Sequence, residues 1–185
     1  MKQIAIFLHG KGERPEWEKY DPIRKIADKL GAELIQITAN IPHRDGTKWF
    51  SVNGFDHSTV NFEELETSEI QIVDIVSKII TERGLDWNNI IWIGHSMGAT
   101  MALRIAMKHG AAKVIAIAPV ILAPVHSNFT VDWIEGGKDD IVPQAEKESF
   151  KILHDLNIPV NHIVSPNSTH DHFELDDYIN SLESI

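Results

Sequence analysis

A serine flanked by glycines is the first residue in this chain whose surroundings suggest chemistry. The run Gly94-His95-Ser96-Met97-Gly98 follows the apolar segment 90–93 and precedes the small-residue segment 99–103. A serine on a tight strand-to-helix turn needs neighbours without bulk where the two backbones cross, and glycine meets that need. Backbone N–H groups at the start of the helix would stabilise negative charge near Ser96. The pattern therefore predicts a nucleophile elbow, and a glycine turn without chemistry is the alternative interpretation.

A serine nucleophile needs a base to take its proton and an acid to orient that base. On this kind of elbow the chain order is serine, acid, histidine, each on a loop after a strand. Two acids and two histidines stand at such places: Asp139 and Asp140 after residues 131–134, and His170 and His172 after residues 160–164. The order fits, but spacing alone does not choose within either pair.

A site of this kind also needs N–H groups that bind an oxyanion. One donor is normally the amide after the nucleophile, here Met97, and the second comes from the loop after an early strand. The first apolar segment ends in His9-Gly10-Lys11-Gly12, which predicts the amide of Lys11 as the second donor. A phosphate-binding loop is the competing interpretation, but the G-x-x-x-x-G-K spacing and the following Ser or Thr are missing.

The chain has ten histidines and no cysteine. The lack of cysteine excludes disulfides, thiolate zinc sites and a cysteine nucleophile. A metal site is imaginable from His154, His162, His170, Asp171 and His172. Their spacing matches no zinc motif, and no H-E-x-x-H run is present. We therefore expect no metal and no dissociable cofactor.

Six short apolar runs must position these residues. They are residues 4–8, 33–37, 90–93, 114–118, 131–134 and 160–164. Runs without polar alternation are typical of strands covered on both faces. Helical periodicity between and after these runs predicts five helices. They extend from a cap at Asp21 to Gly31, over about 67–83, from Ser96 to before Gly110, over about 143–156, and from about Leu175 onward. The alternation predicts a doubly wound, mostly parallel α/β sheet of about six strands with helices on both faces. Residues 39–66 are expected to be a long irregular loop, a kind of segment that is often functional.

Length and charge bound the remaining possibilities. The 185 residues suit a single domain over 1–185. Seventeen basic and 27 acidic residues give a net charge of −10, which makes nucleic acid a poor partner and weighs against polyanionic substrates. No apolar run approaches the ~20 residues of a membrane span, and no signal peptide is recognisable. We therefore expect a cytoplasmic protein.

Three further motifs carry a resemblance. They are the His9–Gly12 turn, the Trp49-Phe50 pair and the G-x-x-D-x-x-V-P sequence at residues 136–143. With the elbow, they make the chain similar to the α/β-hydrolase superfamily, and within it to the carboxylesterase/phospholipase family that includes acyl-protein thioesterases. The resemblance implies Asp139 rather than Asp140 as the acid, and His170 rather than His172 as the base. It also implies oxyanion binding by the Lys11 and Met97 amides. The short turn over 118–130 implies a minimal α/β-hydrolase fold without a cap domain.

The expected activity is hydrolysis of small carboxylic esters or thioesters through an acyl-enzyme on Ser96. Amide or C–C bond hydrolysis by the same triad is an alternative, as is a binding protein on a hydrolase scaffold. Four aromatic residues are candidates for an acyl pocket, with plain core packing as the other interpretation: Trp17, Trp49, Phe50 and Phe55. The sequence leaves the oligomeric state open.

Overall fold

A six-stranded parallel sheet runs through the protein in the order β2-β1-β5-β6-β7-β8. The computed structural model describes residues 3–54, 56–120 and 129–182. The six strands are β1 (Ile4–Leu8), β2 (Glu33–Ile37), β5 (Ile90–His95), β6 (Lys113–Ile117), β7 (Val131–Gly136) and β8 (Val160–Ser165). All neighbouring pairs in this sheet are parallel. The predicted doubly wound α/β fold is confirmed.

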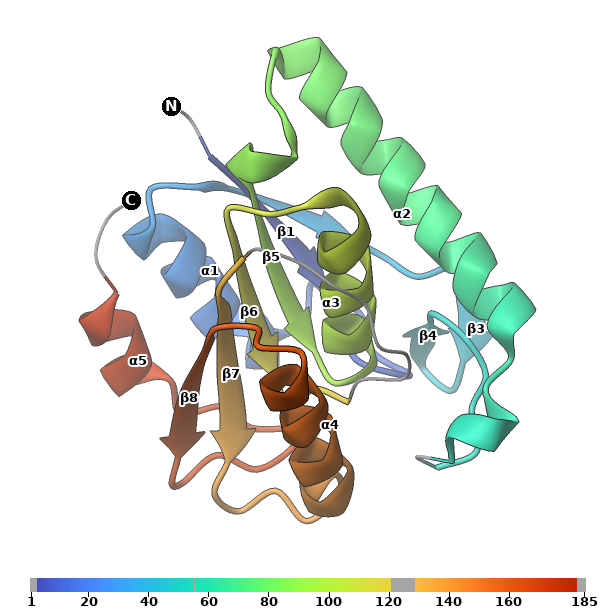
Figure 1. The fold of residues 1–185 in the computed structure, drawn as a ribbon, viewed down its shortest axis with the longest axis vertical. Coiled ribbons are helices and arrows are strands. Elements are labelled where there is room, and N and C mark those ends of the chain that lie inside the picture. The colour runs from blue at the N-terminus through green and yellow to red at the C-terminus, as the bar shows by residue number, and fades with distance from the viewer. Residues whose placement is uncertain (1–2, 55, 121–128, 183–185) are drawn as a thin grey trace.

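Helices cover both faces of the sheet (Figure 1). On one side lie α2 (Phe62–Arg83), α3 (Met97–His109) and α4 (Pro143–Asp155), and on the other lie α1 (Asp21–Lys29) and α5 (Asp176–Ser181). Alternate side chains of β1 enter the two cores: Ile4, Ile6 and Leu8 face the first set of helices, and Ala5 and Phe7 face the second. Burial on both faces explains why the central strands β1, β5, β6 and β7 are mostly apolar, whereas the edge strands β2 and β8 are partly exposed. None of the described helices is long and apolar enough to cross a membrane.

Two helix starts differ from the expectation. Asp21 is the first residue of α1 rather than its cap; Tyr20 occupies the cap position, and Asp21 pairs with Arg24. The second helix begins at Phe62 instead of residue 67, because the side chain of Asn61 caps it by accepting from the Glu64 N–H at 3.2 Å. The apolar side chain of Ile75 on the same helix is 41% exposed.

The segment over 39–66, expected to be irregular, contains a small hairpin. Its strands are β3 (Ile41–His43) and β4 (Gly46–Lys48), and a 3-10 turn (His57–Thr59) and the first turn of α2 follow. Two further 3-10 turns lie at Glu18–Tyr20 and Trp87–Asn89. The hairpin is bound to the loop after β1: the Gly12 N–H donates to the Thr47 carbonyl at 2.7 Å, and the Thr47 N–H donates to the Glu13 carbonyl at 3.1 Å. The hairpin therefore lies beside the glycine-rich turn at the carboxyl end of the sheet.

Candidate active site

Ser96 lies at the junction of β5 and α3, with a backbone conformation that is rare for a residue with a side chain. Its φ is +50° and its ψ is −117°, values that persist only where the surroundings enforce them. A Cβ at Gly98 would collide with the carbonyl oxygens of Leu8 and His9, and one at Gly94 would collide with the backbone of Ala99. The glycines are therefore required because α3 crosses the sheet backbone at contact distance. This is the strand–turn–helix geometry that the sequence predicts for an elbow.

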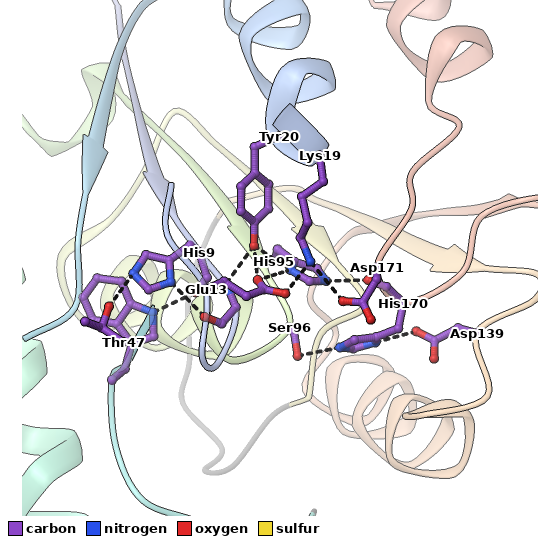
Figure 2. Close-up of polar contacts among 12 residues, drawn as sticks. His9, Glu13, Lys19, Tyr20, Thr47, His95, Ser96, Asp139, His170 and Asp171 are labelled. Carbon is purple, nitrogen blue, oxygen red and sulfur yellow. Dashed lines mark hydrogen bonds and ion pairs between the residues drawn. The ribbon is translucent and has the colours of Figure 1, made fainter. Parts of the chain in front are cut away.

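Three side chains at this edge form a hydrogen-bonded series (Figure 2). The Oγ of Ser96 lies 3.0 Å from Nε2 of His170, and Nδ1 of His170 lies 2.8 Å from Oδ2 of Asp139. Because a carboxylate only accepts, Nδ1 carries the hydrogen and Nε2 keeps a lone pair toward the serine hydroxyl. The arrangement can therefore take a proton from Ser96.

The Asp139 carboxylate is fixed and held ionised. Its Oδ1 accepts the N–H groups of Ile141 and Val142 at 2.8 and 3.3 Å. Burial by itself raises the pKa of Asp139, but the hydrogen bonds from His170 and from these two amides outweigh burial and leave the pKa below its usual value. A carboxylate that stays ionised can orient the imidazole and stabilise its protonated form.

The neighbouring candidates do not join the series. The residues Asp140 and His172 are both exposed. The main chain of His172 closes a turn, since its carbonyl accepts the Thr169 N–H at 3.0 Å and its own N–H donates to Thr169 Oγ1 at 3.2 Å. Of each sequence pair, the structure brings only Asp139 and His170 next to Ser96.

The loops that carry Asp139 and His170 are bound to each other. The N–H of Gly137 donates to the Ser165 carbonyl at 2.8 Å, and the N–H of Lys138 donates to the Ser168 carbonyl at 2.9 Å. A Cβ at Gly137 would lie 2.7 Å from the Cα of Pro166, so the two loops approach too closely for a side chain there. The pairing of β7 with β8 therefore continues into the loops and sets the distance between acid and base.

A buried polar cluster that the sequence analysis missed lies behind Ser96 and His170 (Figure 2). Its centre is Glu13, whose carboxylate accepts from the Tyr20 hydroxyl and pairs with the Lys19 ammonium. His95, fully buried, has Nδ1 within 3.0 Å of the Tyr20 hydroxyl and 3.2 Å of Glu13 Oε2. Lys19 also reaches Asp171 Oδ1 at 2.9 Å. The available signals were local: Glu13 follows the glycine turn directly, and His95 stands inside the elbow motif.

The charge of Glu13 has an opposite partner inside the protein, the Lys19 ammonium. Burial raises the pKa of Glu13, but its hydrogen bond with His95 and the Lys19 ammonium hold that pKa well below the usual range. Burial and the neighbouring Glu13 carboxylate raise the pKa of Tyr20 far above its usual value. Tyr20 therefore stays a hydroxyl, and Glu13 stays a carboxylate that ties the loop after β1 to the elbow.

A pocket of about 350 Å³ opens beside the serine. Its described lining is Lys11, Glu13, Arg44, Phe50, Val52, Gly54, Ser96, Met97, Thr100, Val120, Ile141, His170 and Asp171. Both residues predicted to supply oxyanion donors are in this lining. Of the aromatic candidates, Phe50 lines the pocket. Trp49 is buried and donates from Nε1 to the His9 carbonyl at 2.8 Å, and Trp17 packs against the core on the side of α1. Phe55 lies outside the described residues.

The described residues contain no group of three or more His, Asp or Glu side chains that could hold a metal ion. Four of the five residues considered for a metal set have other partners in the structure. His170 faces Asp139, and Asp171 faces Lys19. His154 and His162 stand on α4 and β8, near Asp155 and Glu135 respectively.

Comparisons with known proteins agree with the fold. A family model described as Phospholipase/Carboxylesterase matches residues 1–172. Esterase PE8 is 23% identical with a TM-score of 0.79, and 97% of this chain and 89% of that chain are covered. The Bacillus cereus carboxylesterase is 21% identical, with coverage of 97% and 86% and a TM-score of 0.78. Arabidopsis thaliana SOBER1 is 15% identical, with coverage of 97% of each chain and a TM-score of 0.77. At these identities the solved structures show a shared fold. No curated protein matches the sequence significantly.

Proposed function

The chain belongs to the phospholipase/carboxylesterase family, and on this premise we propose that it hydrolyses carboxylic esters or thioesters through an acyl-enzyme on Ser96. Family membership makes the protein a hydrolase of the carboxylesterase type. The proposal adds the reacting groups: Ser96 as nucleophile, His170 as general base and acid, and Asp139 as the residue that orients His170.

In the first half of the reaction, Oγ of Ser96 attacks the carbonyl carbon and His170 Nε2 takes the hydroxyl proton. The imidazolium that forms is stabilised by Asp139, whose Oδ2 accepts the Nδ1 hydrogen at 2.8 Å. The carbonyl π bond breaks as the new C–O bond forms, and its electrons become an oxyanion. We assign the amides of Lys11 and Met97 to this oxyanion, since both residues line the pocket with Ser96.

The oxyanion then re-forms the carbonyl and expels the alcohol or thiol, which receives the proton from His170. Water enters, loses a proton to His170 Nε2 and attacks the acyl carbon. Collapse of the second intermediate releases the carboxylic acid and returns the proton to Ser96 Oγ. No further reactant is needed, and all proton transfers use one imidazole.

One observation carries the proposal: the unbroken hydrogen-bonded series from Asp139 through His170 to a serine in a strained elbow. A serine that only closes a turn has no need of an imidazole at 3.0 Å that is itself oriented by a buried carboxylate. Strain and a perturbed carboxylate at one place are typical of catalytic sites.

The direct test is the Ser96→Ala variant, assayed on p-nitrophenyl butyrate and on butyryl-thiocholine for thioester cleavage. Removal of the nucleophile is expected to lower kcat by a factor on the order of 10⁴ or more, with thermal unfolding unchanged. Ser77→Ala on α2 is the matched control and should keep wild-type turnover.

A fluorophosphonate probe separates this mechanism from a binding protein on the same scaffold. The probe should label wild type and Ser77→Ala, and should leave Ser96→Ala unlabelled. Wild-type protein that resists the probe, or a Ser96→Ala variant that turns over esters normally, would refute the proposal.

A further inference from the structure

We infer that the substrate carries a negatively charged group, a carboxylate or phosphate close to the scissile ester, which Lys11 and Arg44 bind at the mouth of the pocket. This inference rests on the proposed ester hydrolysis and names the substrate class of the same site. Lys11 and Arg44 together form the basic rim of the pocket.

The charged residues of the pocket differ in whether they have partners. The two acids in the lining, Glu13 and Asp171, are both paired with Lys19. The two cations are not: within residues 3–54, 56–120 and 129–182, no carboxylate forms an ion pair with Lys11 or Arg44. The single Lys19 ammonium thus pairs with both acids, and the two cations of the lining remain without a partner. The formal net charge of these five groups is +1, so the net charge around the pocket is positive.

The basic rim is built from two segments that the fold holds together. Lys11 stands on the loop after β1, and Arg44 stands in the turn between β3 and β4, with a φ of +51°. Hydrogen bonds from Gly12 to Thr47 and from Thr47 to Glu13 bind the hairpin to that loop. The rim therefore has a fixed position relative to Ser96, although both cations are on the surface.

Each cation keeps donors for a ligand. The Lys11 ammonium gives one hydrogen bond, to the Val52 carbonyl at 3.1 Å, and an ammonium has three N–H groups. The Arg44 guanidinium makes no hydrogen bond to the described part of the chain, and a guanidinium offers a planar fork that suits carboxylate and phosphate oxygens. The two side chains together can bind both oxygens of one anionic group.

Electrostatics at the rim favour an anion over a neutral group. Partial burial, followed by the nearby cations Lys48 and Arg44, lowers the pKa of Lys11. Such mutual repulsion is relieved when an anion binds between the cations. The whole chain has a net charge of −10, so two pocket cations without ion-pair partners in the described part of the chain are a local exception to the charge of the protein.

The lining also limits where the anion lies. Lys11 contributes its amide to the proposed oxyanion site, and its side chain leads from there to the rim. The described lining also has five apolar side chains: Phe50, Val52, Met97, Val120 and Ile141. A small ester fits this arrangement, with an apolar portion between the reacting carbonyl and a terminal anionic group.

The test compares esters that differ only in one charged group. Mono-p-nitrophenyl succinate replaces the terminal methyl of p-nitrophenyl butyrate by a carboxylate, so it places the anion on the acyl side. The butyryl ester of 5-hydroxy-2-nitrobenzoate, which is p-nitrophenyl butyrate with one added ring carboxylate, places it on the leaving-group side. We expect one of these two to exceed p-nitrophenyl butyrate in kcat/KM by roughly tenfold, mainly through a lower KM. The advantage should shrink in about 0.5 M NaCl because salt screens the interaction.

Variants then assign the preference to the basic rim. The readout is the ratio of kcat/KM for the preferred carboxylate ester to that for p-nitrophenyl butyrate within each variant, so that loss of folded enzyme cancels. Lys11→Met and Arg44→Met should each lower this ratio about tenfold, and Arg44→Glu should lower it further. Lys78→Met, which removes an exposed cation on α2, is the matched control and should leave the ratio unchanged.

The outcomes separate this inference from the proposed function. Hydrolysis that survives in Ser96→Ala would refute the ester mechanism itself. If Ser96→Ala abolishes hydrolysis but wild type prefers the neutral ester, the inference alone is overturned. A ratio that stays the same in Lys11→Met and Arg44→Met would also overturn it.

Discussion

The side chain of His95 is hydrogen-bonded to the main chain of His170: Nε2 of the buried imidazole lies 2.9 Å from the His170 carbonyl oxygen. Because a carbonyl only accepts, Nε2 of His95 carries the hydrogen. His95 is the last residue of β5 and directly precedes Ser96. The bond therefore joins the end of this strand to the loop that carries the proposed base. We interpret His95 as a positioning residue that holds the His170 backbone at a fixed distance from Ser96.

Substitution of His95 should change turnover more than substrate binding. His95→Leu removes the donor to the His170 carbonyl, and a shift of the base by about 1 Å lowers kcat about 10- to 100-fold. KM should change little. His95→Gln keeps an N–H donor and should retain several times the kcat of His95→Leu. Steady-state kinetics on p-nitrophenyl butyrate check this, with thermal unfolding to show that both variants fold. Equal kcat values in the two variants would contradict the positioning role.

The adjacent acids and histidines provide an internal comparison. His170→Ala and Asp139→Asn should each lower kcat by a factor on the order of 10³ to 10⁴, since the base or its orientation is lost. Asp140→Asn and His172→Ala change exposed side chains and should remain within about twofold of wild type. Kinetics of the four variants on one ester measure this. A large loss in either exposed variant would mean that the wrong member of that pair has been assigned.

The ionised Glu13 should make stability depend on pH. Its folded-state pKa lies below the unfolded value of about 4.3, so the folded protein binds fewer protons. The stabilisation is present above that value and is lost as the pH falls toward the folded-state pKa. Glu13→Gln should cost about 1–3 kcal/mol at pH 7, because Lys19 loses its buried partner.

Urea unfolding of wild type and Glu13→Gln, followed by tryptophan fluorescence at several pH values between about 7 and 3, measures the effect. The difference in unfolding free energy between the two proteins should be constant near neutral pH and narrow below pH about 4.3. A difference that does not depend on pH would show that Glu13 contributes through shape rather than charge.

Replacing a glycine by alanine should cost more stability where another segment lies in contact with the glycine than where the surrounding space is open. Gly98→Ala places a Cβ against the Leu8 and His9 carbonyl oxygens and should cost about 3 kcal/mol or more, with a fall in kcat as α3 and Met97 move. Gly31→Ala meets no atom within 4 Å at a φ of +66° and should cost about 1 kcal/mol. Its kcat should match wild type. Similar losses of stability in both variants would disprove the close crossing at Gly98.

The sequence predicted the sheet well because its four central strands are largely buried on both faces and therefore form mostly apolar runs. It also predicted the elbow, because Gly94 and Gly98 stand where the crossing backbones leave no space for a side chain. The hairpin was missed because three-residue strands around Pro42 and Gly46 have the composition of a loop. The early start of α2 was missed because its first turn is mostly exposed and lacks a clear apolar stripe.

The polar cluster around Glu13 could not be predicted for a different reason. Glu13 and His95 are 82 positions apart, and only the pairing of β1 with β5 brings their side chains together. Charged residues near a glycine turn are usually exposed, so composition favours the wrong expectation. Trp49 illustrates the same limit: the sequence identified a special aromatic pair, but only the hairpin geometry turns Trp49 beneath His9 and Phe50 toward the pocket.

The hydrogen bonds between the loops after β7 and β8 determine when the site can form during synthesis of the chain on the ribosome. A chain that grows from its N-terminus acquires Ser96 first, Asp139 later and His170 last, and the distance between the last two depends on the Gly137–Ser165 and Lys138–Ser168 hydrogen bonds. A nascent chain that stops short of β8 therefore lacks both the base and the loop that orients the acid. On this mechanism, ester turnover during translation would report the completion of the fold, and a chain truncated before residue 170 would be inert however well its first strands had formed.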